Sequence, residues 1–417
     1  MKIKRTLSLF LAFFMVFTMI PDSTFAAGEE AVYTGQEKAQ DDLDAHLQKV
    51  TEAFEAAGAY LAALQPGTGT VGGDWMALGL ARAGVDLSEE YKQDYWNKVL
   101  SYIKTSCNEE NRLHNNKSSE NSRVILALAA LGYNPEYIGG KNLLAGLSDM
   151  DYVKKQGING SMWALIAFDS KNYEIPVLKG EGTQTTREGL ITEILQAQLA
   201  DGGFALAGET ADADITGMAL QALAPYYTTR EDVKEAIDNA LTCLSNMQTA
   251  TGGYVSWSED NMESNAQVLA GLSALGIDTR TDVRFIKNGN NLLDAILGFA
   301  LEDGSFAHSA DGTETNQMAT EQAYYALTAY ERMLNGANRL YDMSDVEVQI
   351  LLGDANGDGE ISVSDALAIL KYVVGLEQDV FWEEAGDCDG KKGINVEDAL
   401  AVLKYIVGIL DELSASE

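Results

Sequence analysis

Carboxylates and an amide recur at alternate positions in the stretch GDANGDGEISVSDALAILKYVVG, residues 353–375. Counted from the first Asp as position 1, oxygen ligands fall at positions 1, 3, 5, 7, 9 and 12, which are Asp354, Asn356, Asp358, Glu360 (through its backbone carbonyl), Ser362 and Asp365. Gly359 stands at position 6, where a calcium loop turns sharply. Because carboxylates this close repel one another without a cation between them, the spacing predicts a Ca²⁺ site. The alternative is an acidic, solvated turn in which Asp365 caps the following helix.

A second copy of this pattern, GDCDGKKGINVEDALAVLKYIVG, begins 387 − 354 = 33 residues later. Its expected ligands are Asp387, Asp389, Asn395 and Asp398. Lys391 stands at position 5, where the first copy has a ligand oxygen, and the glycine has moved from position 6 to position 7. Because Ca²⁺ repels an ammonium group, we expect Lys391 to point outward or the second site to be the weaker one.

Each loop precedes one apolar helix pattern, SDALAILKYVVG or EDALAVLKYIVG, and lacks the leading helix of an ordinary EF-hand. The duplicated unit resembles the type I dockerin module of cellulosome-like assemblies, over about residues 348–413. The resemblance implies two F-hand calcium loops, calcium-dependent folding, and docking onto a cohesin domain of a scaffold protein. The residues that it places at the cohesin interface are Val363, Ser364, Lys371, Val396, Glu397 and Lys404. The pair Val363–Ser364 differs from the pair Val396–Glu397, which argues against a symmetric docking mode.

The long middle region, from about residue 41 to residue 335, repeats short helix patterns rich in Ala, Gly and Leu. Six share a form: DWMALGLARAG, ENSRVILALAALG, GSMWALIAF, DITGMALQALAPYY, ESNAQVLAGLSALG and TEQAYYALTAY. Helices of this composition are buried on all sides. More amphipathic segments such as REGLITEILQAQL alternate with them, so the repeat of roughly 40 to 55 residues is a two-helix unit. Six such units would close into an (α/α)6 toroid; the alternative is an open solenoid of the HEAT type. The predicted fold class is therefore all-α, a toroid followed by the small calcium-binding module.

Similar glycine-rich connections follow several of the amphipathic segments. They read Gly202-Gly203-Phe204, Gly252-Gly253-Tyr254 and Gly304-Ser305-Phe306, and Gln198 and Gln248 each precede the first glycine by four residues. This pattern resembles the repeat signature of the prenyltransferase and squalene-cyclase toroids. We expect the Gln to tie the ends of outer helices and the aromatic ring to fill the space between layers. The same toroid holds corrinoid in transcobalamin-type proteins and occurs in complement thioester domains, so the fold does not choose the function.

Acidic residues gather where inner helices are expected to begin. Asp212 and Asp214 precede one helix, and Glu263 stands near the start of the next. Further polar residues fall near the same end: Asn261, Glu314, Gln317, Glu321 and Gln322. The stretch DADIT resembles the D-x-D-D-T motif of squalene-type cyclases, which implies that Asp214 is a general acid. Ile215 stands where that motif has its third acid. The alternative, which we favour from the sequence, is that these acids cap the helix.

Two other chemistries are weighed against the sequence. Glycoside hydrolysis needs two facing carboxylates, and Asp214 with Glu263, or Asp74 with Glu120, could supply them. Zinc-dependent prenyl transfer would need a histidine on an inner helix with a cysteine nearby. None of the three histidines, at positions 46, 114 and 308, meets that condition.

The beginning of the chain reads as a secretory signal peptide, with a basic start, an apolar stretch at residues 7–20 and small residues after it. We therefore expect a signal peptide at 1–27, the toroid at 28–340 and the dockerin-like domain at 345–415. The net charge of −34 argues against nucleic acid as a partner, and no later stretch resembles a membrane span. Three cysteines make no disulfide framework, although Cys107 and Cys243 could pair.

The function expected from these features is that of a secreted subunit which docks calcium-dependently onto a cohesin scaffold. Its toroid would bind a polysaccharide, a small hydrophobic ligand or another partner. The subunit as a whole would take part in polysaccharide breakdown. The alternatives are that the toroid is an active glycoside hydrolase, or a squalene-cyclase-like enzyme that uses Asp214.

Overall fold

The computed structural model describes residues 26–256 and 259–415, with side chains from residue 43 onward. The expected signal peptide lies outside the described residues except for its last two positions. Helix α1 (Ala26–Ala62) crosses the division between two compact units, residues 1–49 and residues 50–417. The second unit contains all the other described helices, and it also contains both calcium-loop segments.

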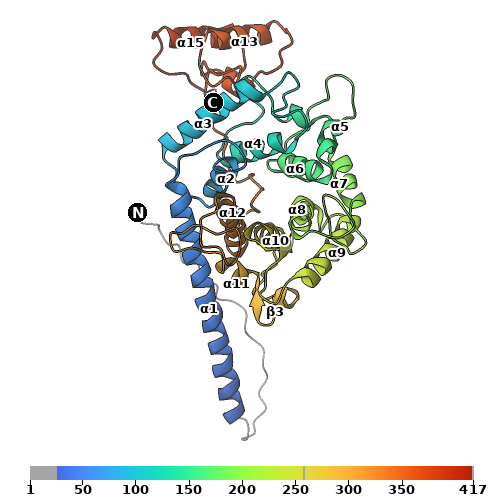
Figure 1. Ribbon diagram of the computed structural model, residues 1–417. Coiled ribbons are helices and arrows are strands. Elements are labelled where there is room, and N and C mark those ends of the chain that lie inside the picture. Colours follow the sequence, from blue (N-terminus) through green and yellow to red (C-terminus); the bar gives the residue numbers. More distant parts are fainter. Residues whose placement is uncertain (1–25, 257–258, 416–417) are drawn as a thin grey trace. The chain divides into compact units, whose positions relative to one another are not determined.

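Six inner helices close into a ring, which confirms the toroid and excludes the open solenoid (Figure 1). They are α2 (Asp74–Arg82), α4 (Ser119–Ala130), α6 (Ile158–Asp169), α8 (Ala213–Leu223), α10 (Met262–Ala274) and α12 (Gln317–Leu334). Each inner helix packs on the next one, and α12 packs on α2. All six coincide with the repeated Ala-, Gly- and Leu-rich patterns of the sequence.

Outer segments alternate with the inner ring, which gives six two-helix repeats. The outer helices are α3 (Glu89–Ser106), α5 (Met150–Val153), α7 (Arg187–Gln196), α9 (Glu231–Met247) and α11 (Leu292–Leu297), and the last turns of α1 supply the sixth. Short 3-10 turns lie between them: η1 (Ala145–Leu147), η2 (Lys154–Gln156), η3 (Ala224–Tyr226) and η4 (Val283–Phe285). Two antiparallel hairpins complete the toroid, β1 (Val255–Ser256) with β2 (Glu259–Asp260) and β3 (Ile286–Lys287) with β4 (Asn290–Asn291). In the described part of the chain, no helix is both long and apolar enough to cross a bilayer.

Small residues allow neighbouring inner helices to approach closely. A Cβ atom added at Gly217 on α8 would lie 2.6 Å from the backbone carbonyl of Gln267 on α10. One added at Gly271 would lie 2.8 Å from the carbonyl oxygen of Gly217. The two helices therefore touch through their backbones, which explains why the inner helices are built from Gly and Ala.

The glutamine and aromatic positions of the repeat signature have the structural role expected of them. The Gln248 side-chain amide donates to the carbonyls of Gly252 at 2.8 Å and Phe285 at 2.9 Å. Gln198 makes the equivalent bonds to Gly202 at 2.8 Å and Ala236 at 2.7 Å. The three signature aromatics, Phe204, Tyr254 and Phe306, are fully buried, and their backbone N–H groups donate to Thr216, Asn265 and Thr320.

The C-terminal module has a core of its own. Helices α13 (Val363–Val373) and α15 (Val396–Ile406) pack together, and the short α14 (Glu383–Gly386) precedes the second loop. Its buried core consists of Ala355, Ala366, Ala368, Ile369, Cys388, Ala399 and Val402. All three cysteines are free thiols, so the suggested pairing of Cys107 with Cys243 is absent from the structure. The domain limits at 340 and 345 stay predictions.

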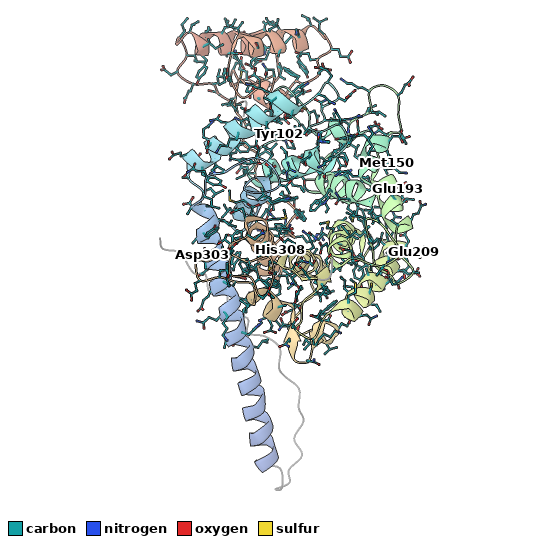
Figure 2. The ribbon with its side chains drawn as sticks, in the orientation of Figure 1. Tyr102, Met150, Glu193, Glu209, Asp303 and His308 are labelled. Carbon is teal, nitrogen blue, oxygen red and sulfur yellow. The ribbon has the colours of Figure 1, made fainter. Side chains whose placement is uncertain are left out.

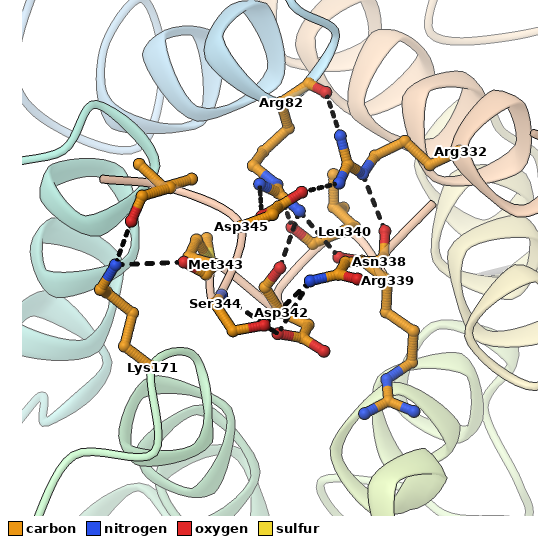
Figure 3. Close-up of polar contacts among 11 residues, drawn as sticks. Arg82, Lys171, Arg332, Asn338, Arg339, Leu340, Asp342, Met343, Ser344 and Asp345 are labelled. Carbon is orange, nitrogen blue, oxygen red and sulfur yellow. Dashed lines mark hydrogen bonds and ion pairs between the residues drawn. The ribbon is translucent and has the colours of Figure 1, made fainter. Parts of the chain in front are cut away.

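The segment that leaves α12, residues 335–350, is called the strap below. Arg82 on α2 binds it through the backbone carbonyls of Leu340 at 2.9 Å and Asp342 at 2.8 Å, and through an ion pair with Asp345 at 2.7 Å (Figure 3). Arg332 on α12 also pairs with Asp345. These bonds hold the strap against the C-terminal ends of inner helices.

Candidate functional site

The N-terminal ends of the inner helices meet at one end of the ring, called the acidic rim below. Asp212 is the N-cap of α8: its Oδ1 accepts the backbone N–H groups of Asp214 at 2.9 Å and Ile215 at 3.2 Å. Its Oδ2 accepts the hydroxyl of Ser256 at 2.9 Å. The cap is therefore Asp212, and the expectation that Asp214 caps the helix is wrong, because Asp214 already lies in the first turn.

Asp214 is a carboxylic acid held in a partly buried position. Its Oδ1 is buried and has no hydrogen-bond partner among the described residues. Burial raises the pKa of Asp214 to about 6, and the neighbouring carboxylates of Asp212 and Glu263 act in the same direction. A carboxyl group with such a pKa can hold a proton near neutral pH and transfer it to a bound molecule.

Glu263, which the sequence places beside Asp214, is bound to a histidine. Its Oε2 lies 2.8 Å from Nδ1 of His308, a residue labelled in Figure 2. His308 comes from the loop before α12 and reaches the start of α10, where the backbone N–H of Met262 donates to its carbonyl at 3.0 Å. The sequence offers His308 only as a possible zinc ligand, and no local pattern predicts its contact with Glu263 because the loop is distant in the chain.

Glu321 on α12 is a second buried acid of the rim. Its side chain is fully buried, and Oε1 accepts the backbone N–H of Gly72 and the amide of Gln317, both at 2.7 Å. Oε2 is buried without a hydrogen-bond partner in the described structure. Burial raises the pKa of Glu321 to about 7. The sequence groups Glu321 with the rim but assigns it no role.

The pair Asp74 and Glu120, offered above for glycoside hydrolysis, is held by an arginine instead. Arg123 lies between them, with Nε 2.7 Å from Asp74 and Nη2 2.7 Å from Glu120. Tyr95 also donates to Asp74 at 2.8 Å, and Tyr102 (Figure 2) to Glu120 at 3.3 Å. Because one guanidinium binds both carboxylates, this cluster is a buried ion network rather than a facing acid and base.

Aromatic and amide side chains fill the middle of the ring. The rings of Trp75 and Trp163 lie 5.0 Å apart, and those of Trp75 and Tyr325 lie 6.0 Å apart. Gln221 donates to the side chain of Gln267 at 3.0 Å, and Gln267 donates in turn to Tyr325. These contacts join side chains of α2, α6, α8, α10 and α12.

The first calcium-loop segment gathers its carboxylates. Asp354, Asp358 and Asp365 each offer an oxygen, and these oxygens lie within 4.8 Å of one another. Burial raises the pKa of Asp354 to about 7, and the charges of Asp365 and Asp358 add to the effect. A divalent cation would relieve this repulsion, and the oxygen-only donor set fits Ca²⁺.

The second segment gathers Asp387, Asp389 and Asp398 within the same 4.8 Å limit. Lys391 points outward, since its side chain is 68% exposed and pairs with Glu397. Its ammonium nevertheless stays 3.5 Å from Asp389. The outward position of Lys391 is one of the two outcomes expected from the sequence, and the lower affinity of the second site stays a prediction.

The helix after each loop begins with a capping box. Ser362 is the N-cap of α13 and Asp365 the third helical residue, so Asp365 is not the cap that the alternative interpretation required. Asn395 and Asp398 repeat this arrangement in α15. The six residues that the dockerin resemblance places at a partner interface, from Val363 to Lys404, are all exposed.

Comparisons with known proteins return only distant likenesses. No family model matches the chain, and no curated protein matches it either. Among solved structures, an apo variant of the type II terpene cyclase MstE from Scytonema aligns with 70% of this chain and 99% of that chain, at 12% identity and a TM-score of 0.48. A variant of the same cyclase in complex with geranylgeranyl dihydroxybenzoate, its substrate, covers 69% and 99%, at 12% identity and a TM-score of 0.44. A protein from Actinoplanes covers 68% and 99%, at 12% identity and a TM-score of 0.41. At these values the fold assignment depends on the closed ring of inner helices and not on the likeness.

Proposed function

We propose that this chain is a secreted docking subunit whose C-terminal dockerin-like module binds Ca²⁺ and then a cohesin domain of a scaffold protein, in a cellulosome-like assembly. Docking would present the toroid, and the toroid would bind a ligand or a partner that takes part in polysaccharide breakdown. The observation that carries the proposal is the pair of three-carboxylate clusters, each directly followed by a helix with an exposed apolar face.

The apolar faces of α13 and α15 support a protein partner. Val374 is 69% exposed and Val407 67% exposed, although apolar side chains of a folded domain are usually covered. Further exposed apolar residues line these helices and the turns after them: Val363, Leu367, Leu370, Val373, Leu376, Val396, Leu400, Leu403, Ile406 and Ile409. Calcium binding would stabilise the loops that hold the two helices, and a partner would cover the exposed faces.

Calorimetry of the full chain with a recombinant type I cohesin domain tests the proposal. We expect binding with Ca²⁺ and none with a chelator. Val363→Asp should weaken the affinity by at least about tenfold, because a charge then enters the centre of the interface. Val177→Asp is the matched control, since Val177 is an exposed valine of the toroid. Equal binding with and without Ca²⁺ would contradict the proposal.

A second candidate function is proton-donor catalysis at the acidic rim, as in the squalene-cyclase-like alternative. The raised pKa of Asp214 and the absence of a partner for its Oδ1 favour it. In that reaction Asp214 would protonate an alkene or a leaving group. The glycoside hydrolase alternative would add Glu263 as the second carboxylate, although Glu263 is bound to His308.

A screen of isoprenoid and polysaccharide substrates separates these cases. If the rim is catalytic, Asp214→Asn should abolish turnover at an unchanged melting temperature. Asp212→Asn is the control, because the amide keeps an oxygen that can cap α8. No product from either substrate class with the wild-type chain would leave docking as the supported function.

A further inference from the structure

A cavity of about 650 Å³ lies at the end of the ring opposite the acidic rim. The C-terminal parts of α6, α8, α10 and α12 form its floor and walls, and the strap covers part of it. Ile166, Ala222 and Ala270 give it an apolar surface, while Arg339 and Tyr341 come from the strap. Its volume is typical of sites that hold small organic ligands.

Buried polar atoms without partners line this cavity. Gln221 is 6% exposed and Ser273 is 5% exposed. Gln221 Oε1, Ser273 Oγ and the hydroxyl of Tyr341 have no hydrogen-bond partner among the described residues. The amide nitrogen of Gln221 donates to the backbone of Gln267 at 3.2 Å, which fixes the side chain while its oxygen stays free. Because an unsatisfied buried polar atom costs about 1–3 kcal/mol, a ligand that supplied a donor would be favoured here.

Most charges around the cavity are already satisfied within the protein. Asp169 accepts from Arg187 and from Tyr226, both at 2.7 Å. Lys171 donates to backbone carbonyls of the strap, including that of Met343 at 3.2 Å (Figure 3). Asp342 accepts the backbone N–H of Ser344 at 3.2 Å and its hydroxyl at 2.6 Å.

Arg339 is the exception. Its guanidinium points away from the bonds that hold the strap (Figure 3). Its positive charge acts on the carboxyl of Asp169, which lines the same cavity, but it forms no ion pair among the described residues. It is exposed at the cavity, in a chain that carries a net charge of −34. A cation of this kind, beside an apolar space, is suited to pair with an anionic group on a ligand.

We propose that this cavity binds a small organic carboxylate whose apolar body carries a hydroxyl group. The carboxylate pairs with Arg339 at the mouth, and the body lies against Ile166, Ala222 and Ala270. The hydroxyl donates to Gln221 Oε1 at the floor. The orientation follows from the helix dipoles: the C-terminal ends of inner helices carry partial negative charge, so an anion is disfavoured deep inside and a donor is favoured there.

Calorimetric titration of the full chain with hydroxynaphthoate, whose hydroxyl and carboxylate lie on opposite rings, tests the proposal. Two analogues accompany it: the carboxamide of the same shape, and naphthoate without the hydroxyl. We expect hydroxynaphthoate to bind at least about tenfold more tightly than the carboxamide, because only the carboxylate pairs with Arg339.

Two variants locate the site. Arg339→Gln should lower the affinity for hydroxynaphthoate at least about tenfold and leave the affinity for the carboxamide unchanged. Arg284→Gln removes an equal charge far from the cavity and should change neither. Gln221→Met should abolish the preference for hydroxynaphthoate over naphthoate, because the acceptor of the ligand hydroxyl is lost. The proposal is overturned if no binding heat is seen, if Arg339→Gln binds like the wild type, or if the carboxamide binds as well as the carboxylate.

Discussion

Asp212 accepts the backbone N–H of Asp214 at 2.9 Å, so the two carboxylates of the ADADIT stretch have different tasks. Asp212 satisfies free N–H groups at the start of α8, whereas Asp214 lies two residues further, in the first turn, with a partnerless Oδ1. A capping carboxylate stabilises the helix, whereas a carboxylate with one buried oxygen that accepts no hydrogen bond costs stability unless it is protonated.

Substitutions at the two positions should therefore differ. Asp212→Ala should lower the free energy of unfolding by about 0.5–2 kcal/mol, because the cap is lost. Asp214→Ala should leave it unchanged or raise it at neutral pH. Chemical denaturation of both variants checks this, with Asp212→Asn as a nearly neutral control. If Asp214→Ala is the more destabilised variant, our assignment of the cap is wrong.

Glu321 should make stability depend on pH. Its pKa is raised from 4.5 to about 7, so below pH 4.5 the folded and unfolded states both hold the proton. Between pH 4.5 and about 7 the unfolded state releases it while the folded state keeps it. The free energy of unfolding therefore falls as pH rises through this window.

Glu321→Gln removes this dependence. It should be more stable than the wild type at pH 8, by up to about 3 kcal/mol, and the gain should vanish near pH 4. Thermal denaturation across this range measures it, with the exposed Glu90→Gln as control. A gain of equal size at both ends of the range would contradict the assignment of the titration to Glu321.

The two calcium loops should respond differently to substitution. Asp358→Ala removes an expected ligand of the first loop and should weaken Ca²⁺ binding at least about tenfold. Lys391→Ala removes an ammonium group 3.5 Å from Asp389, so it should leave the second site unchanged or tighten it. Calcium titration of the full chain by calorimetry compares them. Equal losses in both variants would show that the register of the loops is wrong.

Gln248 should stabilise the toroid although it is polar. Gln248 is 7% exposed, and its side-chain amide donates hydrogen bonds to two backbone carbonyls. Truncation of the side chain to Ala would leave both carbonyls without this donor. Gln248→Ala should lower the free energy of unfolding by about 1–3 kcal/mol. The exposed Gln93→Ala on α3 is the control and should lie within about 0.5 kcal/mol of the wild type. A neutral Gln248→Ala in urea denaturation would remove the structural role given to the repeat signature.

Elements that depend on neighbours in the chain can be predicted from the sequence alone. The six inner helices follow from local composition, because a run of Ala, Gly and Leu is both helical and fit for burial wherever it packs. The calcium-loop spacing is equally local: twelve consecutive residues place the carboxylates of Asp354, Asp358 and Asp365 together, as the structure finds them. The binding of Ca²⁺ at this loop stays a prediction, and so does the binding of a cohesin domain to the module.

Contacts between groups that are distant in the chain become visible only once the ring has closed. Arg123 joins Asp74 to Glu120, His308 reaches Glu263 from 45 residues away, and Arg82 holds Asp345 from 263 residues away. No periodicity encodes these pairs, because they depend on how the six repeats close and on the course of the strap. The same holds for Asp214, whose pKa is set mainly by burial, and burial is a property of the closed ring rather than of the DADIT stretch.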